Sequence, residues 1–272
     1  HLQVNCMGKG NLMVLLESGS GNFSVDWLPI QAEIAKFAKV CAYDRAGHGW
    51  STASANPRSI PQIAQELHEL LLCINQQEPI ILVGHSLGGL YAQYFARKFP
   101  NYVAGMVLLD SSHPDLYPLM SKQALRANHY RLLKMWLAAR FGLLQTKIMV
   151  PPDVPAQFTP DTRRLLAKFW SHPKFWWTMI DQNRYLNERV PAVFADSGPF
   201  PDIPLIILTP PGAAWAAALG AELPAAWLAH QEKLAQLSPH GKLIYAEQSG
   251  HMNHYDQPTL VIEAIREIVE QL

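Results

Sequence analysis

Short, almost continuous runs of apolar residues alternate along the chain with longer stretches in which apolar residues recur every three or four positions. The apolar runs, several of them bounded by Gly, Pro or Asp, lie at Leu12–Leu16, Val40–Tyr43, Ile80–Val83, Gly105–Leu109, Leu205–Leu208 and Lys242–Ala246. Runs of this kind predict strands that are covered on both faces, as in a parallel sheet. The chain also opens in a strand-like segment, from His1 to Cys6.

The periodic stretches predict helices that connect these strands. They lie at Ile30–Lys39, Ile60–Gln76, Leu90–Lys98 and, after Pro258, at Thr259–Leu272. Strands that alternate with helices indicate right-handed βαβ units, and therefore an α/β protein with a mostly parallel central sheet flanked by helices.

One long segment interrupts this alternation. Between about His113 and Phe200 no strand pattern is found, and the segment is rich in Pro and Trp. Its helical patterns lie at Lys122–Phe141, Thr162–Trp170 and Phe175–Leu186. We therefore expect an α/β core made of residues 1–112 and 201–272, with a helical cap, residues 113–200, inserted into it.

Composition favours an enzyme for small molecules. The chain has 272 residues, 49% of them hydrophobic and 16% charged, with a formal net charge of zero. Such a chain can bury one large core, and without a prominent Lys/Arg cluster we expect no nucleic-acid partner. No apolar run reaches the roughly 18 residues of a membrane span, and no signal-peptide pattern is present. This favours a cytoplasmic location and leaves open a signal or anchor removed upstream of His1.

The three cysteines are Cys6, Cys41 and Cys73. An odd number without C-x-x-C spacing predicts neither a disulfide framework nor a zinc site. We expect each of them to be a small buried side chain.

The segment Ile80–Gly89 carries the strongest chemical signal. An apolar strand runs into G-H-S-L-G, and a helical pattern follows. This is the setting of a nucleophile elbow, in which a sharp turn exposes the serine hydroxyl at the carboxyl edge of the sheet. Ser86 is therefore the candidate nucleophile, and the Leu87 N–H, at a helix start, is a candidate oxyanion donor. The alternative is a purely structural turn; His85 should point away from Ser86.

A serine hydroxyl needs a neighbouring imidazole to take its proton. In an elbow-bearing fold that histidine follows the last strand, and Ser249-Gly250-His251 follows Lys242–Ala246. His251 is the candidate base. His254 is its competitor, with a loop or pocket wall as its alternative position.

The acid that orients this histidine is harder to find. The loop Thr209–Ala214, where it commonly lies, contains no carboxylate, and Glu222 falls inside or near a helix. Asp110 ends the strand after the nucleophile helix, from where it could reach His251. We assign Asp110 as the acid; the alternative is a cap of the turn that follows it. Asp202 precedes its strand and lies at the wrong edge.

Two loops after early strands complete the pattern. Glu17–Asn22 reads E-S-G-S-G-N, and we expect the Ser20 N–H to be the second oxyanion donor. The alternative is a simple Gly/Ser turn, because the segment lacks the ending of a phosphate-binding loop. In Asp44–Ser51, Asp44 and Arg45 are expected to form an ion pair that braces loops near the site.

Taken together, these segments resemble the α/β-hydrolase fold superfamily. The matching pieces are L-L-E-S-G-S-G, A-Y-D-R-A-G-H-G-W-S, L-V-G-H-S-L-G-G, V-L-L-D-S-S-H-P and S-G-H-M, in the expected order over nearly the whole chain. The placement of Asp110 is similar to that in haloalkane dehalogenases and zearalenone-type lactonases. Dehalogenases use an Asp nucleophile, so Ser86 argues against halide displacement. The resemblance also implies that the usual first strand is absent or upstream of His1.

The expected function is hydrolysis of a carboxylic ester through an acyl-enzyme, without metal or cofactor. The partner would be a small ester-type substrate, hydrophobic or aromatic if the Trp-rich cap lines the pocket; alternatively, those aromatic residues only pack the cap. A lactonase or amidase would use the same residues. A third alternative keeps the fold but changes the function, to a ligand-binding receptor or a cofactor-free lyase that uses the same pocket. The sequence does not specify an oligomeric state.

Overall fold

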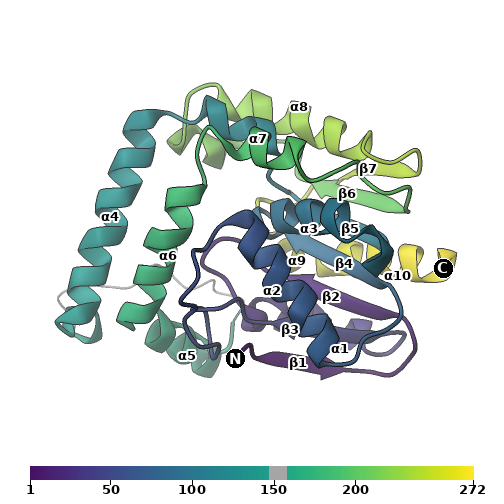
Figure 1. Cartoon of the computed structure of the whole chain (residues 1–272), viewed down its shortest axis with the longest axis horizontal. Helices are drawn as coiled ribbons and strands as arrows, with labels where there is room; N and C mark the ends of the chain where they lie inside the picture. The colour runs from purple at the N-terminus through teal and green to yellow at the C-terminus, as the bar shows by residue number, and fades with distance from the viewer. Residues whose placement is uncertain (147–157) are drawn as a thin grey trace.

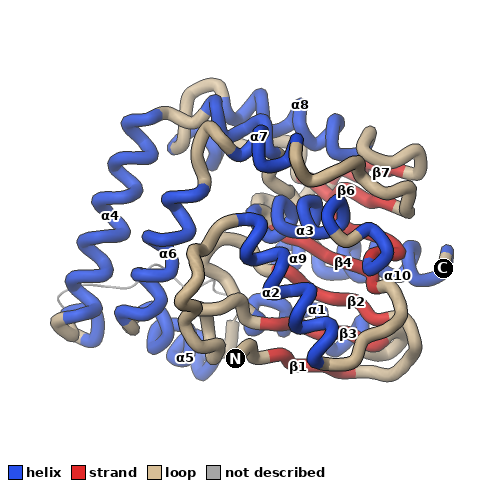
Figure 2. The backbone as a smooth tube through the Cα atoms, viewed as in Figure 1, coloured by secondary structure: helices blue, strands red, loops and turns tan. Residues whose placement is uncertain are grey.

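The computed structural model describes residues 1–146 and 158–272, and these residues form a seven-stranded sheet at the centre of the molecule (Figures 1 and 2). Its strands are β1 (Val4–Met7), β2 (Met13–Glu17), β3 (Lys39–Tyr43), β4 (Ile80–His85), β5 (Val103–Leu109), β6 (Leu205–Thr209) and β7 (Gly241–Tyr245). Their order is β1-β3-β2-β4-β5-β6-β7, and β1 alone runs antiparallel to its neighbour. The predicted mostly parallel sheet is confirmed.

Helices cover both faces of this sheet and also form the segment between β5 and β6. The helices are α1 (Leu28–Ile34), α2 (Ile60–Cys73), α3 (Leu87–Lys98), α4 (Lys122–Arg140), α5 (Pro160–Trp170), α6 (Pro173–Tyr185), α7 (Val190–Ala195), α8 (Leu223–Ala235), α9 (Asn253–Asp256) and α10 (Pro258–Gln271). Short 3-10 turns lie at Ser24–Trp27, Pro100–Tyr102, Pro114–Leu119, Leu143–Gln145 and Ala214–Ala218. The first predicted helix is shorter than expected, because β3 already begins at Lys39.

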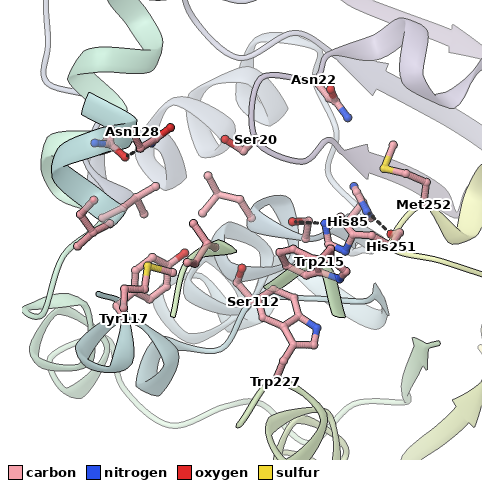
Figure 3. Close-up of a pocket in the computed structure, with 17 residues that line it drawn as sticks. Ser20, Asn22, His85, Ser112, Tyr117, Asn128, Trp215, Trp227, His251 and Met252 are labelled. Atoms are coloured by element: carbon pink, nitrogen blue, oxygen red, sulfur yellow. Dashed lines mark hydrogen bonds between the residues drawn. The ribbon is translucent and has the colours of Figure 1, made fainter. Parts of the chain in front are cut away.

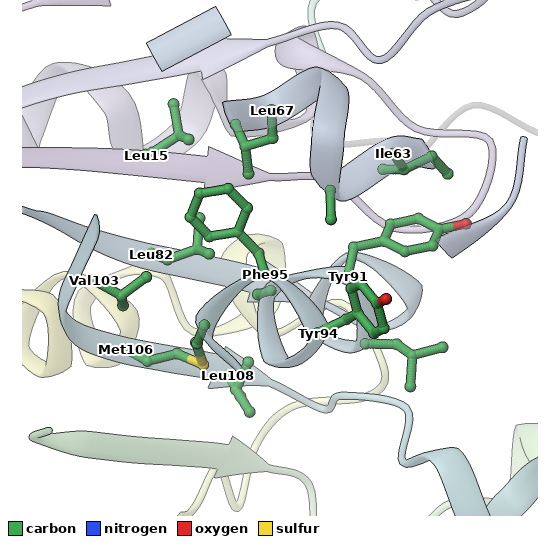
Figure 4. Packing of buried hydrophobic residues seen from close by; sticks show 14 of the residues in the cluster. Leu15, Ile63, Leu67, Leu82, Tyr91, Tyr94, Phe95, Val103, Met106 and Leu108 are labelled. Carbon is green, nitrogen blue, oxygen red and sulfur yellow. The ribbon is translucent and has the colours of Figure 1, made fainter. Parts of the chain in front are cut away.

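Alternate residues of the inner strands point into two separate cores. Leu82 of β4 packs with α2 and α3, where Phe95 is fully buried (Figure 4). Its neighbour Val83 points to the other face, toward Ile30 of α1 and Ile265 of α10. Both faces of a central strand are therefore buried, which explains the uninterrupted apolar runs in the sequence.

Helices α4, α5 and α6 of the segment between β5 and β6 stand beside the sheet, whereas Phe194 of α7 packs on Tyr94 of α3. Helices α4 and α6 lie side by side at the left of Figure 1, and α5 lies near their lower ends. In residues 113–146 and 158–200 the structure contains helices and turns and no strand. The three predicted helices are present, and the short helix α7 was not predicted. Residues 147–157 of the expected cap lie outside the described part of the chain.

The expectation of three buried cysteines without a disulfide is confirmed only for the burial of Cys41 and is otherwise wrong. Cys6 and Cys41 form a disulfide between β1 and β3, where they are direct cross-strand partners. Cys41 is buried, Cys6 is exposed, and Cys73 is an exposed free thiol. Spacing along the chain gave no hint of the pairing, because antiparallel register brings together two residues that are 35 positions apart.

None of the helices in residues 1–146 and 158–272 is both long enough and apolar enough to cross a bilayer.

Candidate active site

Ser86 occupies the bend between β4 and α3. Its backbone has φ 52° and ψ −119°, a conformation that is strained for a residue with a side chain. The bend is tight enough to require the surrounding glycines. A Cβ on Gly84 would lie 2.6 Å from the Cα of Gly89, and a Cβ on Gly88 would lie 2.3 Å from the carbonyl oxygen of Glu17. The G-x-S-x-G spacing therefore produces the predicted elbow.

Three distant segments bring Ser86, His251 and Asp110 together. Nε2 of His251 lies 3.0 Å from Oγ of Ser86, and Nδ1 of the same ring lies 2.6 Å from Oδ2 of Asp110. With its Nδ1–H donated to the carboxylate, the neutral ring presents the Nε2 lone pair to the serine hydroxyl. This arrangement can remove a proton from Ser86 and stabilise the resulting imidazolium.

Asp110 is fully buried and its carboxylate accepts hydrogen bonds on both oxygens. Oδ1 accepts from the Thr209 hydroxyl at 2.9 Å and from the Trp227 indole N–H at 2.7 Å, while Oδ2 faces His251. Its backbone has φ 40° at the end of β5. Three side chains thus fix this carboxylate, and in the described residues it makes no hydrogen bond to the turn that begins at Ser111. Glu222, the rejected alternative, is exposed just before α8.

The two histidines beside His251 have other partners. His254 is buried against the Trp27 ring, and its Nε2 lies 3.3 Å from Oδ2 of Asp26. Nε2 of His85 donates to the carbonyl oxygen of His251 at 2.8 Å, so this ring holds the backbone of the candidate base. Burial, together with the His254 and His251 rings, keeps the pKa of His85 well below its ordinary value. No sequence pattern predicts this bond, because it joins residues 166 positions apart.

The backbone amides expected to bind an oxyanion come from two different segments of the chain. Leu87 is the first residue of α3, where an amide has no acceptor within the helix, and Ser20 belongs to the loop after β2. Ser20, Ser86 and Leu87 all line one cavity. Arg45 donates to the carbonyl oxygen of Gly19 at 2.6 Å. Because a trans peptide points its C=O and N–H in opposite directions, this bond turns the Ser20 N–H away from Arg45.

The expected ion pair between Asp44 and Arg45 is wrong. Arg45 instead forms a buried ion pair with Glu17, which also accepts a hydrogen bond from the Tyr43 hydroxyl. Asp44 accepts from the backbone N–H groups of Ser24 and Trp50, at 2.8 and 2.9 Å. Burial raises the pKa of Glu17, and the adjacent guanidinium of Arg45 opposes that rise.

A cavity of about 310 Å³ opens beside Ser86 and has mostly apolar walls (Figure 3). Its lining comes from the core and from the segment 113–200: Ser20, Asn22, His85, Ser86, Leu87, Ser112, Tyr117, Met120, Leu125, Asn128, Asn183, Leu186, Trp215, Leu219, Trp227, His251 and Met252. The Trp215 ring packs on His251 with the centroids 4.1 Å apart. At the opposite end of the cavity, Asn183 accepts a hydrogen bond of 3.2 Å from the Asn128 amide. The cavity is therefore apolar in the middle and polar at both ends.

Two groups of side chains in the described residues have the composition of metal ligands. The first is Asp26, His85 and His254, and the second is His113, Asp115 and His230. In the first group, the Asp26 carboxylate already accepts hydrogen bonds from Asn22 and Tyr255 and faces Nε2 of His254. Nε2 of His85 is likewise occupied, because it donates to the carbonyl oxygen of His251. In the second, Nε2 of His230 lies 3.4 Å from the cationic Nζ of Lys233. We assign an ion to neither group.

Comparison with known proteins agrees with this architecture. A sequence profile of the alpha/beta hydrolase family matches residues 13–264. The uncharacterized protein YbdG of Bacillus subtilis is 24% identical over 171 residues, which are 62% of this chain and 52% of that protein. The chain spans about half, or less, of the length of the curated relatives it matches.

Solved structures share the fold at low sequence identity. A thermophilic esterase from Thermogutta terrifontis superposes with a TM-score of 0.72 at 22% identity, covering 99% of this chain and 93% of that one. A putative lipase from Acinetobacter baumannii gives a TM-score of 0.68 at 20% identity, with coverage of 99% and 87%. With a family profile that matches most of its length, and with the sheet, elbow and strand order described above, this chain belongs to the alpha/beta hydrolase family.

Proposed function

We propose that this protein is a serine hydrolase that cleaves carboxylic esters through an acyl-enzyme intermediate. The observation that carries the proposal is the chain of contacts from Oγ of Ser86 to Nε2 of His251, 3.0 Å, and from Nδ1 of His251 to Asp110, 2.6 Å. A strained backbone presents the hydroxyl, a neutral imidazole accepts its proton, and a buried carboxylate holds that imidazole in the required tautomer.

In the proposed reaction, His251 takes the proton of Ser86 while Oγ attacks the ester carbonyl carbon. The carbonyl oxygen gains the negative charge, and the alcohol then leaves with the proton carried by His251. A water molecule, deprotonated by the same ring, attacks the acyl-enzyme and releases the acid. Asp110 stays ionised throughout and stabilises the imidazolium.

The amides of Leu87 and Ser20 are proposed as the oxyanion donors. The Leu87 N–H lies at the N-terminus of α3, where the helix dipole favours negative charge. The bond from Arg45 to the Gly19 carbonyl supports the other donor, because it fixes the orientation of the peptide that carries the Ser20 N–H. Arg45 is thus a positioning residue, and Glu17 holds it in place.

The cavity supports a small substrate with a hydrophobic or aromatic group. Most of its lining is aliphatic or aromatic, with Tyr117, Met120 and Leu125 contributed by the segment 113–200. We propose that this segment acts as the cap of the active site. The hydrogen-bonded pair Asn128 and Asn183 marks the end of the cavity where a polar substituent would be accommodated.

Activity with a set of p-nitrophenyl esters of increasing acyl length tests the proposal. We expect turnover in the wild type and a loss of about 10⁴-fold or more in Ser86→Ala. A lactonase or amidase would instead prefer a lactone or anilide in the same assay. A binding protein or a lyase on this fold would hydrolyse none of these substrates, and that result would refute the proposal.

The acid is tested separately by Asp110→Asn, with Glu222→Gln as the control. We expect kcat to fall by about 10³- to 10⁴-fold in Asp110→Asn, because the amide cannot hold the same imidazole tautomer, and to stay unchanged in the exposed control. A full-rate Asp110→Asn enzyme would defeat the assignment.

A further inference from the structure

We propose that the outer face of α4 docks this protein onto the surface of an anionic lipid membrane. The face consists of exposed apolar side chains in line along the helix, flanked by exposed basic ones. This membrane contact is a separate property from the proposed hydrolase activity and does not depend on it.

Three large apolar side chains form a stripe along the outside of α4 and its end. Tyr130 is 62% exposed, Leu137 is 42% exposed and Phe141 is 73% exposed. Their spacing of seven and four residues places them within about 40° of one another around the helix axis. Burying such side chains is favourable, so large exposed apolar side chains aligned on one face of a helix indicate a surface that meets another apolar phase.

Every charged residue of α4 is basic. The helix has 19 residues, and its charged side chains are Lys122, Arg126, Arg131, Lys134 and Arg140. In the described part of the chain none of these five forms an ion pair. Arg126 and Lys134 lie on either side of the stripe at helical spacing. An exposed apolar stripe edged with cations is the pattern of a helix that lies in a membrane interface.

Basic residues are concentrated in the segment that contains α4, and acidic residues in the rest of the chain. Residues 113–200 contain 12 basic and six acidic side chains, whereas the rest of the chain contains 10 basic and 16 acidic ones. A net charge of zero therefore hides a cationic segment beside an anionic core. Such a molecule would approach an anionic surface with α4 first.

The position of α4 allows the contact. The helix lies at the edge of the molecule, with α6 on its inner side (Figure 1). On α6, Trp177 is 49% exposed and packs against Trp136 of α4, which extends the apolar surface. Leu125 and Asn128, on the inner side of α4, line the cavity beside Ser86. A docked α4 would thus bring the cavity within one helix width of the lipid.

A lipid surface explains the stripe better than other partners do. A nucleic acid would use the basic side chains and leave Leu137 and Phe141 exposed. A second copy of this chain would bring two cationic faces together, which costs electrostatic free energy. Lipid satisfies both features at once, since acyl chains accept the apolar residues and acidic headgroups face the cations.

Co-sedimentation with vesicles tests the proposal, using equal parts phosphatidylcholine and phosphatidylglycerol, with pure phosphatidylcholine for comparison. We expect the wild-type protein to bind the mixed vesicles, to bind pure phosphatidylcholine at least about tenfold more weakly, and to be partly released by salt. The triple variant Tyr130→Ser, Leu137→Ser, Phe141→Ser should bind the mixed vesicles at least about tenfold more weakly. The control Leu72→Ser, Tyr245→Ser, at exposed apolar positions of the core, should bind like the wild type.

Thermal melting of each variant checks that the fold is intact. Wild-type protein that stays in the supernatant would overturn the proposal. Binding that persists in the triple serine variant but disappears in Arg126→Gln, Lys134→Gln would also overturn it, because a purely ionic contact is what a nucleic acid or any polyanion would make. A dimer in sedimentation velocity that the serine variant abolishes, without vesicle binding, would assign the face to self-association instead. Ser86→Ala should bind as the wild type does, so binding and hydrolysis can fail independently.

Discussion

The indole N–H of Trp227 donates a hydrogen bond of 2.7 Å to Oδ1 of Asp110, the carboxylate oxygen that does not face His251. Trp227 lies on α8, far along the chain from the strand that ends in Asp110. The Thr209 hydroxyl donates to the same oxygen, Oδ1, so that Oδ2 of the buried carboxylate is left for the imidazole. The proposed acid is thus held by the element that follows β6, where such an acid would more commonly lie.

Replacing Trp227 should weaken both the site and the fold. In Trp227→Phe a fully buried carboxylate loses one donor, and hydrogen bonds to charged groups contribute about 1.5–3 kcal/mol. We expect kcat to fall about tenfold and the free energy of unfolding to fall by about 1–2 kcal/mol. Steady-state kinetics and urea denaturation measure the two effects.

The matched control is Trp215→Phe. Trp215 lies in the same cavity, but its indole nitrogen has no hydrogen-bond partner among the described residues. A Trp227→Phe enzyme no more impaired than this control would show that the bond to Asp110 is irrelevant to catalysis.

The ion pair between Glu17 and Arg45 should affect rate and stability in separable ways. In Arg45→Met the buried Glu17 loses its cationic partner, which should cost about 3–5 kcal/mol of stability. The Gly19 carbonyl loses its short bond from the guanidinium as well and keeps only the longer one of 3.4 Å from the Asn22 N–H. The Ser20 peptide is then held less firmly, and we expect kcat to fall by about 10²-fold.

The double variant Glu17→Gln, Arg45→Met separates the two effects. Removing the uncompensated carboxylate should restore much of the stability, whereas the rate should stay low because the guanidinium donor to Gly19 is still missing. Recovery of the rate along with the stability would contradict a positioning role for Arg45.

Stability should decrease on acidification because three buried histidines resist protonation. Burial keeps the pKa of His48 and of His85 well below the ordinary value of 6.5, and burial with the nearby His230 lowers the pKa of His113 to about 4. The unfolded chain takes up these protons as the pH falls through 6.5, whereas the folded chain does not, so each ring favours unfolding below that pH.

For His113 the loss of stability amounts to about 1.5 kcal/mol between pH 6.5 and pH 5. We therefore expect the free energy of unfolding, measured in urea, to fall over this range and to fall less steeply in His113→Asn, whose amide can still accept from the Asp115 N–H. A stability that rises on acidification, or a slope unchanged in the variant, would be inconsistent with the three lowered pKa values.

The disulfide should stabilise the edge of the sheet. The link between Cys6 and Cys41, which are 35 residues apart, lowers the entropy of the unfolded chain. In the chain-entropy model this raises the free energy of unfolding by about 3–4 kcal/mol. A reductant should accordingly lower the melting temperature of the wild type and of Cys73→Ser, and leave Cys6→Ser, Cys41→Ser unaffected. Equal sensitivity of all three proteins would show that the pair is not formed in solution.

Much of the fold could be predicted because buried parallel strands and tight turns leave short-range patterns in the sequence. Strands covered on both faces appear as apolar runs, and a glycine-flanked Ser86 requires a tight turn. The edge at which Asp110 and His251 meet follows from parallel strand direction. The Thr209 donor could have been inferred in the same way, since β6 lies beside β5 and ends at the same edge.

Other features depend on packing that no local pattern records. Trp227 meets Asp110 across 117 positions, and Cys6 meets Cys41 only through antiparallel register. Asp44 and Arg45 looked like a pair because they are adjacent, yet each found a different partner in the fold. The exposed stripe of α4 became visible only when the structure showed which face of that helix is covered.

Labelling with a fluorophosphonate, followed by peptide mass spectrometry, asks whether the Ser86 hydroxyl is activated, because the probe phosphonylates activated serine hydroxyls far faster than ordinary ones. We expect one adduct, on Ser86, that is absent in Ser86→Ala and strongly slowed in His251→Ala. A wild-type protein that forms no adduct, or forms it on another residue, would contradict the proposed nucleophile and the mechanism built on it.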